Sequence, residues 1–236
     1  MSETRQLPLD LPVAERRGRE DWIVSEANAE ATRFVDRWPD WPSDVVLLIG
    51  PPGSGKSHLA RLHAETSGAR TLSAAALAEC DPTVLAAAPL ILEDAGEGVD
   101  ETALFHLLNA VRAAGGSLLV TAETPPAAWG LGLPDLVSRL RAATPVTLAE
   151  PDDALLEALL AKLFADRQMV VDPAVIAWMA RRMERSFAAA RDLVAALDRE
   201  ALAAKSALTR AVAARVLAAG FGRDPSQDDL DETDDA

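Results

Sequence analysis

The chain has 236 residues, of which 49% are hydrophobic, a single cysteine and a formal net charge of −14 at pH 7. This length and apolar content suit an α/β core with a small second domain, and they exclude an extended or wholly disordered chain. A lone Cys80 excludes an internal disulfide framework and a cysteine-rich zinc site, and no stretch is long and apolar enough to span a bilayer. We therefore expect a soluble, cytoplasmic protein with no membrane partner.

The negative charge is concentrated near the C-terminus. Removing the seven acids there from −14 leaves −7 for the rest of the chain, which is still acidic. These seven are Asp224, Asp228, Asp229, Asp231, Glu232, Asp234 and Asp235. An acidic body disfavours affinity for a phosphate backbone, so direct sequence-specific DNA binding is not expected. Residues 221–236 are predicted to be a disordered acidic tail.

The N-terminal residues 1–20 are predicted to be a flexible tail, because prolines and charges interrupt them and no periodicity is present. Within them, residues 6–11 read QLPLDL. Alternating leucines behind a glutamine suit an extended peptide that lies in an apolar groove, although a tail with some leucines is the simpler interpretation. Residues 21–24 then predict a short strand or an apolar plug, and residues 26–38 predict a helix.

A phosphate-binding loop is predicted at residues 50–57, GPPGSGKS, which fit the pattern G-x-x-x-x-G-K-[ST]. The apolar run 45–49 before it predicts a buried strand, and residues 56–62 after it suit a helix, which is the context that the motif requires. Glycines let consecutive N–H groups point at phosphate oxygens, and the helix dipole adds to their field. The alternative is a glycine-rich turn that binds nothing.

The loop predicts a site for ADP or ATP with Mg²⁺. Lys56 should reach the β and γ phosphates, and Ser57 should ligate the metal. The predicted nucleotide-binding residues of the loop are Pro52, Gly53, Ser54, Gly55, Lys56, Ser57 and His58. Trp22, Trp38 and Trp41 are further candidates to border the base, with core packing as the alternative.

Further buried strands are expected at residues 69–72, 89–94, 117–121 and 144–148, with a helix at 100–114. The alternation of strand and helix predicts a parallel sheet flanked by helices. The strand at 89–94 ends in two acids, Glu93 and Asp94. We expect this strand beside the loop strand, where one acid would serve the Mg²⁺ shell and the other the attacking water. The alternative is a pair of helix N-cap acids.

Thr121 is the polar end of the next strand and Glu123 lies nearby, at the place where a γ-phosphate sensor is expected. A short helix at 133–141 carries Arg139 near its end, where a cation is also favoured by the helix dipole alone. From residue 151 only helices are predicted, at 152–167, 172–183, 186–204 and 209–218, each opening on a cap residue. The predicted domains are therefore a nucleotide-binding domain at 21–150 and an all-helical lid at 151–220.

The order of these motifs resembles the AAA+ ATPases and, within them, the DnaA family of replication initiators. The resemblance covers roughly residues 21–219 and rests on collinear segments. They are SEAN at 25–28, GSGKSH at 53–58, TAETPP at 121–126, LPDLVSRL at 133–140 and RDL at 191–193. The resemblance implies that Arg139 is an arginine finger for a neighbouring subunit's nucleotide, and that Arg191 is a lid sensor for the chain's own nucleotide.

Two further features resemble the Hda family of regulatory DnaA homologues. DnaA has a DNA-reading domain after the lid, whereas the residues after the predicted lid here form an acidic tail. Residues 6–11 resemble a peptide that docks on the β sliding clamp of DNA polymerase III. The resemblance implies clamp anchors at Gln6, Leu7, Leu9 and Leu11. It also implies that the protein is a negative regulator of replication initiation, which stimulates hydrolysis of DnaA-bound ATP.

The resemblance leaves some properties open. DnaA usually has an aspartate where this chain has Glu93, which questions intrinsic hydrolysis but not nucleotide binding. Self-association through Arg139 is a further possible contact. Two alternative functions are an autonomous ATPase or helicase-loader-type motor, and a DNA-binding initiator relative that the charge balance disfavours.

Overall fold

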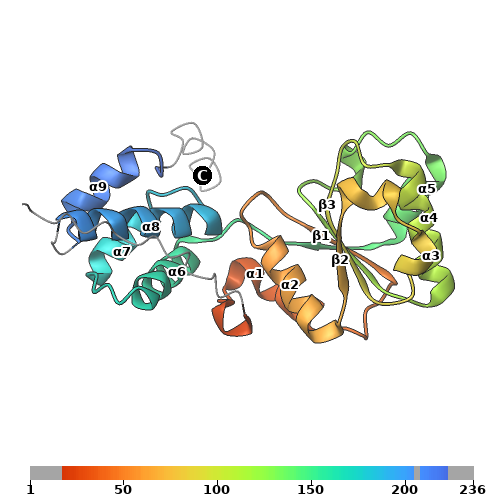
Figure 1. The fold of residues 1–236 in the computed structure, drawn as a ribbon, viewed down its shortest axis with the longest axis horizontal. Helices are drawn as coiled ribbons and strands as arrows, with labels where there is room; N and C mark the ends of the chain where they lie inside the picture. Colours follow the sequence, from red (N-terminus) through yellow and green to blue (C-terminus); the bar gives the residue numbers. More distant parts are fainter. Residues whose placement is uncertain (1–17, 205–207, 223–236) are drawn as a thin grey trace, which may run out of the picture.

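The computed structural model describes residues 18–204 and 208–222. It divides into an α/β domain and a helical lid (Figure 1). The predicted fold class, a parallel sheet flanked by helices and followed by a helical lid, is confirmed. The predicted clamp segment at 6–11 and the acids of 224–235 lie outside the described residues.

Within the described residues, five parallel strands form one sheet in the order β2-β3-β4-β1-β5. Their bounds are β1 Val45–Ile49, β2 Arg70–Ser73, β3 Leu90–Ala95, β4 Leu118–Ala122 and β5 Thr144–Thr147. Because all strands run the same way, their C-terminal ends meet at one edge, here named the carboxyl edge, and their N-terminal ends meet at the amino edge. The carboxyl edge therefore gathers the polar groups that follow β1, β3 and β4.

One expectation about the sheet is wrong. The acid-tipped strand β3 does not pair with the loop strand β1, because β4 lies between them and pairs with both. Parallel pairing joins segments that are distant in sequence, so neighbouring apolar runs do not reveal which strand is inserted. As a result, the end of β4 lies between the phosphate loop and the acids.

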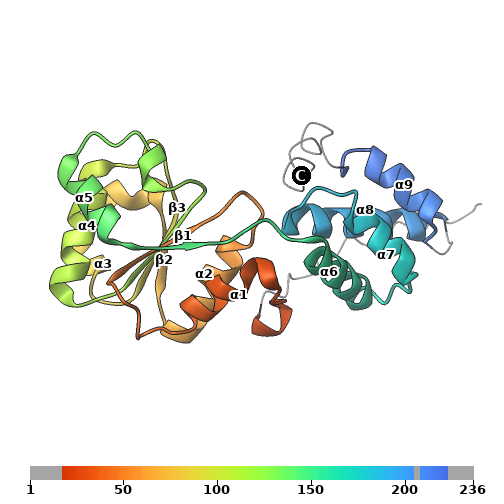
Figure 2. The same ribbon diagram turned by 180° about the vertical axis from the view of Figure 1, so that it is seen from behind.

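Helices cover both faces of the sheet (Figure 2). The helices α1 Glu26–Val35 and α2 Lys56–Ser67 cover one face, where Leu48, Leu59 and Leu119 are buried. The other face is covered by η2 Ala74–Glu79, α3 Pro82–Leu85, α4 Glu101–Ala114 and α5 Pro134–Ala142. Short 3-10 turns occur at η1 Arg19–Asp21 and η3 Pro126–Ala128.

The N-terminal predictions need two corrections. Residues 21–24 form no strand; instead Trp22 is buried, as the alternative of an apolar plug implied. Helix α1 ends at Val35 rather than near residue 38. The chain tightens into i→i+3 turns after it, with the N–H of Arg37 donating to Phe34 O and the N–H of Trp38 to Val35 O.

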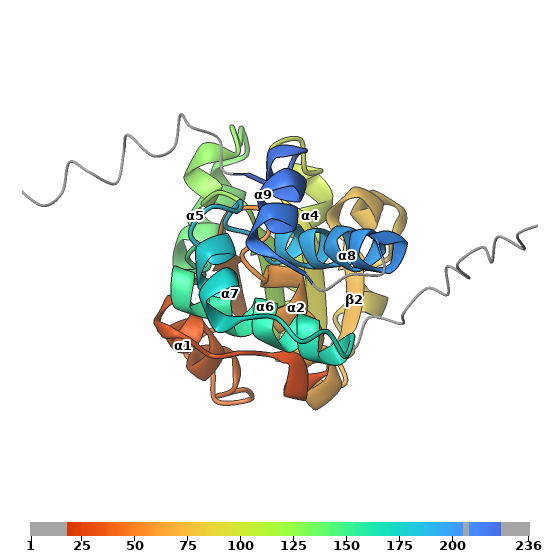
Figure 3. The same cartoon turned by 90° about the vertical axis from the view of Figure 1, so that its left-hand side faces the viewer.

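The lid contains α6 Asp153–Asp166, α7 Pro173–Ala180, α8 Phe187–Ala204 and α9 Arg210–Ala218 (Figure 3). These helices surround a core of their own, which includes Leu156, Leu160, Phe164, Met179 and Leu193. Helix α7 ends before the predicted residue 183, because Met183 forms an antiparallel bridge with Gly222. None of the helices among the described residues could span a membrane.

Candidate nucleotide site

The phosphate loop joins β1 to α2 at the carboxyl edge. Gly53 has φ +74° and Gly55 has φ +97°, conformations that L side chains rarely adopt. Helix α2 begins directly after Gly55, so its N-terminus faces into the loop. The loop therefore has the backbone that an anion site at a helix N-terminus requires.

Lys56 is 7% exposed, and its ammonium group is held inside the loop. Nζ donates to the carbonyl oxygens of Gly50 at 2.6 Å and Pro51 at 2.8 Å. Burial lowers the pKa of Lys56, while the nearby carboxylates of Glu123 and Asp94 act in the opposite direction. The cation is thus fixed at the loop, within the field of acids from β3 and β4.

The loop also fits a bound phosphate at Ser54. Its side chain is 2% exposed, and among the described residues its hydroxyl has no hydrogen-bond partner. Buried hydroxyls normally have a partner, so an orphaned one in a phosphate loop suits a ligand oxygen. Ser57, in contrast, is exposed in the first turn of α2, where its hydroxyl is accessible to a metal ion.

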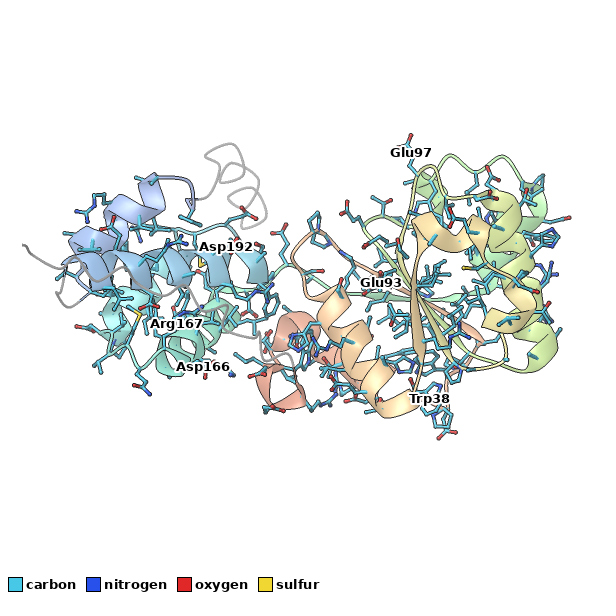
Figure 4. The ribbon with its side chains drawn as sticks, in the orientation of Figure 1. Trp38, Glu93, Glu97, Asp166, Arg167 and Asp192 are labelled. Carbon is cyan, nitrogen blue, oxygen red and sulfur yellow. The ribbon has the colours of Figure 1, made fainter. Side chains whose placement is uncertain are left out.

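The acidic end of β3 has an irregular backbone. Asp94 has φ +59°, and the register with β4 shifts between Leu92 and Ala95. Such left-handed, bulged residues occur often beside functional sites because they redirect side chains. Glu93 is half-buried, and its pKa is raised, first by burial and then by the charge of Asp94. Glu93 lies at the end of the strand that faces the lid (Figure 4).

Thr121 joins the acids to the next strand. Its side chain is fully buried, and its Oγ1 accepts a hydrogen bond of 3.0 Å from the backbone N–H of Asp94. The predicted sensor residue therefore supports the turn that carries the acids. Glu123 lies just past the end of β4, is exposed, and acts electrostatically on Lys56.

The lid touches the phosphate loop directly. The backbone N–H of Phe187, the first residue of α8, donates to the carbonyl oxygen of Gly53 at 3.1 Å. A Cβ added at Gly53 would lie 2.3 Å from Cβ of Ser186. This contact places the start of α8 directly against the loop backbone.

Trp22 packs where the loop and the lid meet. Its ring stacks on Phe187 with centroids 6.2 Å apart and meets the His58 ring edge-on at 5.1 Å. Its Nε1 donates to Thr32 Oγ1 at 3.0 Å. Three tryptophans were candidates to border the nucleotide base, and Trp22 is the one that lies near the loop.

The other two tryptophans lie elsewhere. Trp38 donates from Nε1 to Ser117 Oγ at 3.1 Å, just before β4, and so belongs to the amino edge (Figure 4). Trp41 stacks on His63 with centroids 4.8 Å apart, and Trp38 meets the same ring edge-on at 5.8 Å. Both are used in packing.

Arg191 lies four residues after Phe187 in α8, so the two side chains project from the same face of the helix. It is half-buried; burial lowers its pKa, and the charge of Asp192 acts in the opposite direction. The Phe187 ring lies 3.4 Å from the position of a Cβ added at Gly55, so this face of α8 is turned toward the α/β domain at the loop.

Arg139 lies at the opposite end of the sheet. Its guanidinium carbon is 5.4 Å from the centroid of the Phe105 ring, and it lines a pocket of about 450 Å³ together with Asp44, Arg112 and Ser138. Asp44 precedes β1, whereas the phosphate loop follows β1. The five residues of β1, at about 3.3 Å each, separate the two places.

Comparisons with known proteins concern the fold of the chain. No family model matches the chain. The chromosomal replication initiator protein DnaA of Sphingopyxis alaskensis is 34% identical over 133 residues, a match that covers 54% of this chain and 28% of that protein. Domain III of the Thermotoga maritima initiator DnaA has a TM-score of 0.73 at 16% identity, covering 89% of this chain and 99% of that one. The fold is that of a DnaA AAA+ domain.

A second solved structure, the initiator DnaA bound to AMPPCP and single-stranded DNA, has a TM-score of 0.66 at 19% identity and covers 79% of this chain and 66% of that one. The sequence match spans little more than a quarter of the full-length relative. The likeness to DnaA therefore concerns the fold of this chain and only a part of the full-length relative.

Within this DnaA-like fold, the predicted residues separate into two groups. Lys56, Asp94, Thr121 and Glu123 are brought together at the carboxyl edge, whereas Arg139 lies at the amino edge. The sequence predicted Ser186 as a helix cap, but it gave no signal for the contact of Ser186 and Phe187 with the loop. Among the described residues, no cluster of three or more acidic, histidine or cysteine side chains could hold a metal alone.

Proposed function

We propose that this protein is a nucleotide-binding negative regulator of replication initiation, of the Hda type, which stimulates hydrolysis of ATP bound to DnaA. The observation that carries the proposal is the position of Arg139. It lies at the amino edge, away from the chain's own phosphate loop, and lines a pocket there. In this proposal, Arg139 serves a nucleotide held by a neighbouring molecule.

The proposed chemistry is electrostatic. An arginine finger stabilises the charge that develops on the transferring phosphoryl group, an effect of about 10³ to 10⁵ in rate. The ring of Phe105 under the Arg139 guanidinium restricts the orientations of the side chain. In this proposal, the nucleophilic water and the metal belong to the DnaA site, and this chain contributes the cation.

The chain's own loop is proposed to bind ADP or ATP. The orphaned Ser54 hydroxyl, the helix N-terminus and the fixed Lys56 ammonium support a phosphate ligand. Ser57, with Glu93 and Asp94, would hold Mg²⁺, which would screen the phosphate charge. A DnaA structure of the same fold contains the ATP analogue AMPPCP, which favours adenine as the base. In this arrangement Arg191 on α8 would report the bound nucleotide to the lid.

Docking on the β sliding clamp is proposed from the sequence of residues 6–11 alone, which lie outside the described residues. Deleting 6–11 is expected to abolish binding to clamp-loaded DNA. Unchanged clamp binding by the deletion variant would contradict this part of the proposal.

The deciding experiment measures hydrolysis of DnaA-bound ATP with and without this protein and clamp-loaded DNA. The wild type should accelerate hydrolysis only with the clamp, and Arg139→Ala should not accelerate it. Arg141→Ala is the matched control, because Arg141 is an exposed arginine in the same helix and does not line the Arg139 pocket. Equal acceleration by wild type and Arg139→Ala would refute the finger assignment.

A second candidate function, an autonomous ATPase, is favoured by the acids near Lys56. Asp94 and Glu123 both act electrostatically on Lys56. In this alternative they would serve as general base and metal ligand at the chain's own loop. This alternative predicts steady ATP turnover by the isolated protein, which Lys56→Ala would abolish. No turnover, together with stimulation of DnaA, would favour the regulator.

A further inference from the structure

Two arginines of the lid share one tryptophan. The guanidinium carbons of Arg182 and Arg210 each lie 4.9 Å from the centroid of the Trp178 ring. Both arginines are exposed, and the indole is half-buried. We call Trp178, Arg182 and Arg210 the Trp178 cluster. It brings two cations from α9 and the end of α7 to one place on the lid surface.

Among the described residues, the Trp178 cluster has no ion-paired carboxylate of the kind that accompanies Arg185 and Arg215. Arg185 lies 3.5 Å from Asp153, and Arg215 lies 3.2 Å from Glu200. Within residues 18–204 and 208–222, neither Arg182 nor Arg210 forms an ion pair, and Arg182 donates only to the carbonyl oxygen of Trp178. In a chain of net charge −14, two adjacent cations with no ion pair among the described residues form a local site for an anionic group.

The last described residues of the chain lie beside Arg182. Gly222 pairs with Met183, the residue after Arg182, and the N–H of Glu184 donates to Phe221 O at 3.2 Å. Asp224 follows Gly222 by two residues, and residues 224–235 contain seven acids and no cation. At about 3.3 to 3.6 Å per residue, these twelve residues span up to about 40 Å, far enough to pass both arginines.

We propose that the acidic segment 224–235 docks on the Trp178 cluster of its own lid. Its attachment beside Arg182 makes binding intramolecular, with an effective concentration of order millimolar for a short linker. The carboxylates neutralise Arg182 and Arg210, so the segment covers a cationic surface that would otherwise accept phosphates or acidic peptides. The docking is independent of the function proposed above.

The test uses the full chain with a nitroxide spin label at Leu230→Cys, in a Cys80→Ala background that removes the natural thiol. The indole N–H signals of the five tryptophans are followed by NMR, and Trp178 is assigned with Trp178→Phe. At low salt the label should selectively broaden the Trp178 signal relative to that of Trp38, which lies in the other domain. Raising NaCl to about 0.5 M should restore the signal, because exposed charges are then screened.

Two variants separate docking from mere proximity. Arg182→Gln with Arg210→Gln should restore the Trp178 signal without added salt. Arg181→Gln should not, because this neighbouring exposed arginine is oriented toward Glu157, 3.9 Å away. Broadening that persists in the double variant, or no selective broadening in the parent, would overturn the proposal. Broadening in a mixture of spin-labelled unenriched chains and ¹⁵N-enriched unlabelled chains would assign the contact to a second copy and overturn it equally.

Discussion

The backbone N–H of Asp94 donates to the hydroxyl oxygen of Thr121, 3.0 Å away on the neighbouring strand. Through this bond, the residue expected to sense the nucleotide holds the left-handed turn of the acidic residue. The sensor residue Thr121 and the acidic end of β3 are therefore joined by a direct hydrogen bond.

Thr121→Val should destabilise the protein and weaken Mg²⁺-dependent nucleotide binding together. The substitution keeps the shape but leaves the Asp94 N–H of this part-buried hydrogen bond without its acceptor. We expect a cost of about 1 kcal/mol in the free energy of unfolding. Urea unfolding and nucleotide titration with and without Mg²⁺ measure the two effects. Thr124→Val, at an exposed threonine, should change neither. A stable Thr121→Val with unaltered binding would show that the bond has no such role.

Gly53→Ala should disrupt the contact between the loop and the lid. The new Cβ would lie 2.3 Å from Ser186 Cβ, and φ +74° already disfavours alanine. Gly68→Ala is the matched control, since it has φ +69° with nothing within 4 Å of the added atom. Gly68→Ala should lower the free energy of unfolding by about 1 to 2 kcal/mol because of backbone strain. Gly53→Ala should lose more and also alter Trp22 fluorescence; equal losses would contradict the clash.

Lys56→Met should lower the affinity for ADP and ATP about 10- to 100-fold, because a charged hydrogen bond contributes about 1.5 to 3 kcal/mol. Fluorescent nucleotide titration is a direct measurement. Arg61→Met, in the same helix but exposed, should bind as the wild type does. If Lys56→Met bound nucleotide normally, the loop would not be the phosphate site.

His63 should make stability depend on pH. Burial lowers the pKa of His63 from 6.5 to about 4, and the side chain is 3% exposed between Trp38 and Trp41. The unfolded chain then binds more protons between these values, so stability is level above pH 6.5 and falls as the pH drops toward 4. The pKa difference between the unfolded and folded states, at 1.36 kcal/mol per pKa unit, corresponds to a total loss of roughly 3 kcal/mol in the free energy of unfolding.

Urea unfolding from pH 4.5 to 7.5 measures this dependence. His63→Gln should flatten the slope, although the variant itself is expected to be less stable because a polar amide replaces a ring in a packed site. His106→Gln, at an exposed histidine, should keep the slope of the wild type. An identical slope in His63→Gln would assign the pH dependence to other groups.

Local features of the fold were predictable from the sequence, because each depends on residues close in the chain. The run 45–49, the glycines of the loop and the caps Asp152, Asp172 and Thr209 each define their own element. Strand order was not predictable, since parallel pairing joins distant segments. The insertion of β4 between β1 and β3 is the clearest example.

The candidate site shows the same division. Lys56 and the acids of β3 follow from a motif and a strand end. The contact of Phe187 with Gly53, and the bond between Asp94 and Thr121, depend on how separate elements pack and have no local signal. The assignments of Arg139, Arg191 and residues 6–11 rest on family resemblance and stay predictions.

Because Arg139 and the phosphate loop lie at opposite edges of the sheet, the domain has two different ends. A two-fold symmetric dimer uses the same surface patch on both subunits, and one such patch does not include both Arg139 and the loop. A partner that offers its loop to Arg139 therefore contributes a different surface. Such heterologous contacts generate rings or open helices, and every assembly built on them has a distinct front and back. In the proposed finger role, Arg139 would reach a neighbouring domain only if the nucleotide loop of that domain is not already covered by another subunit.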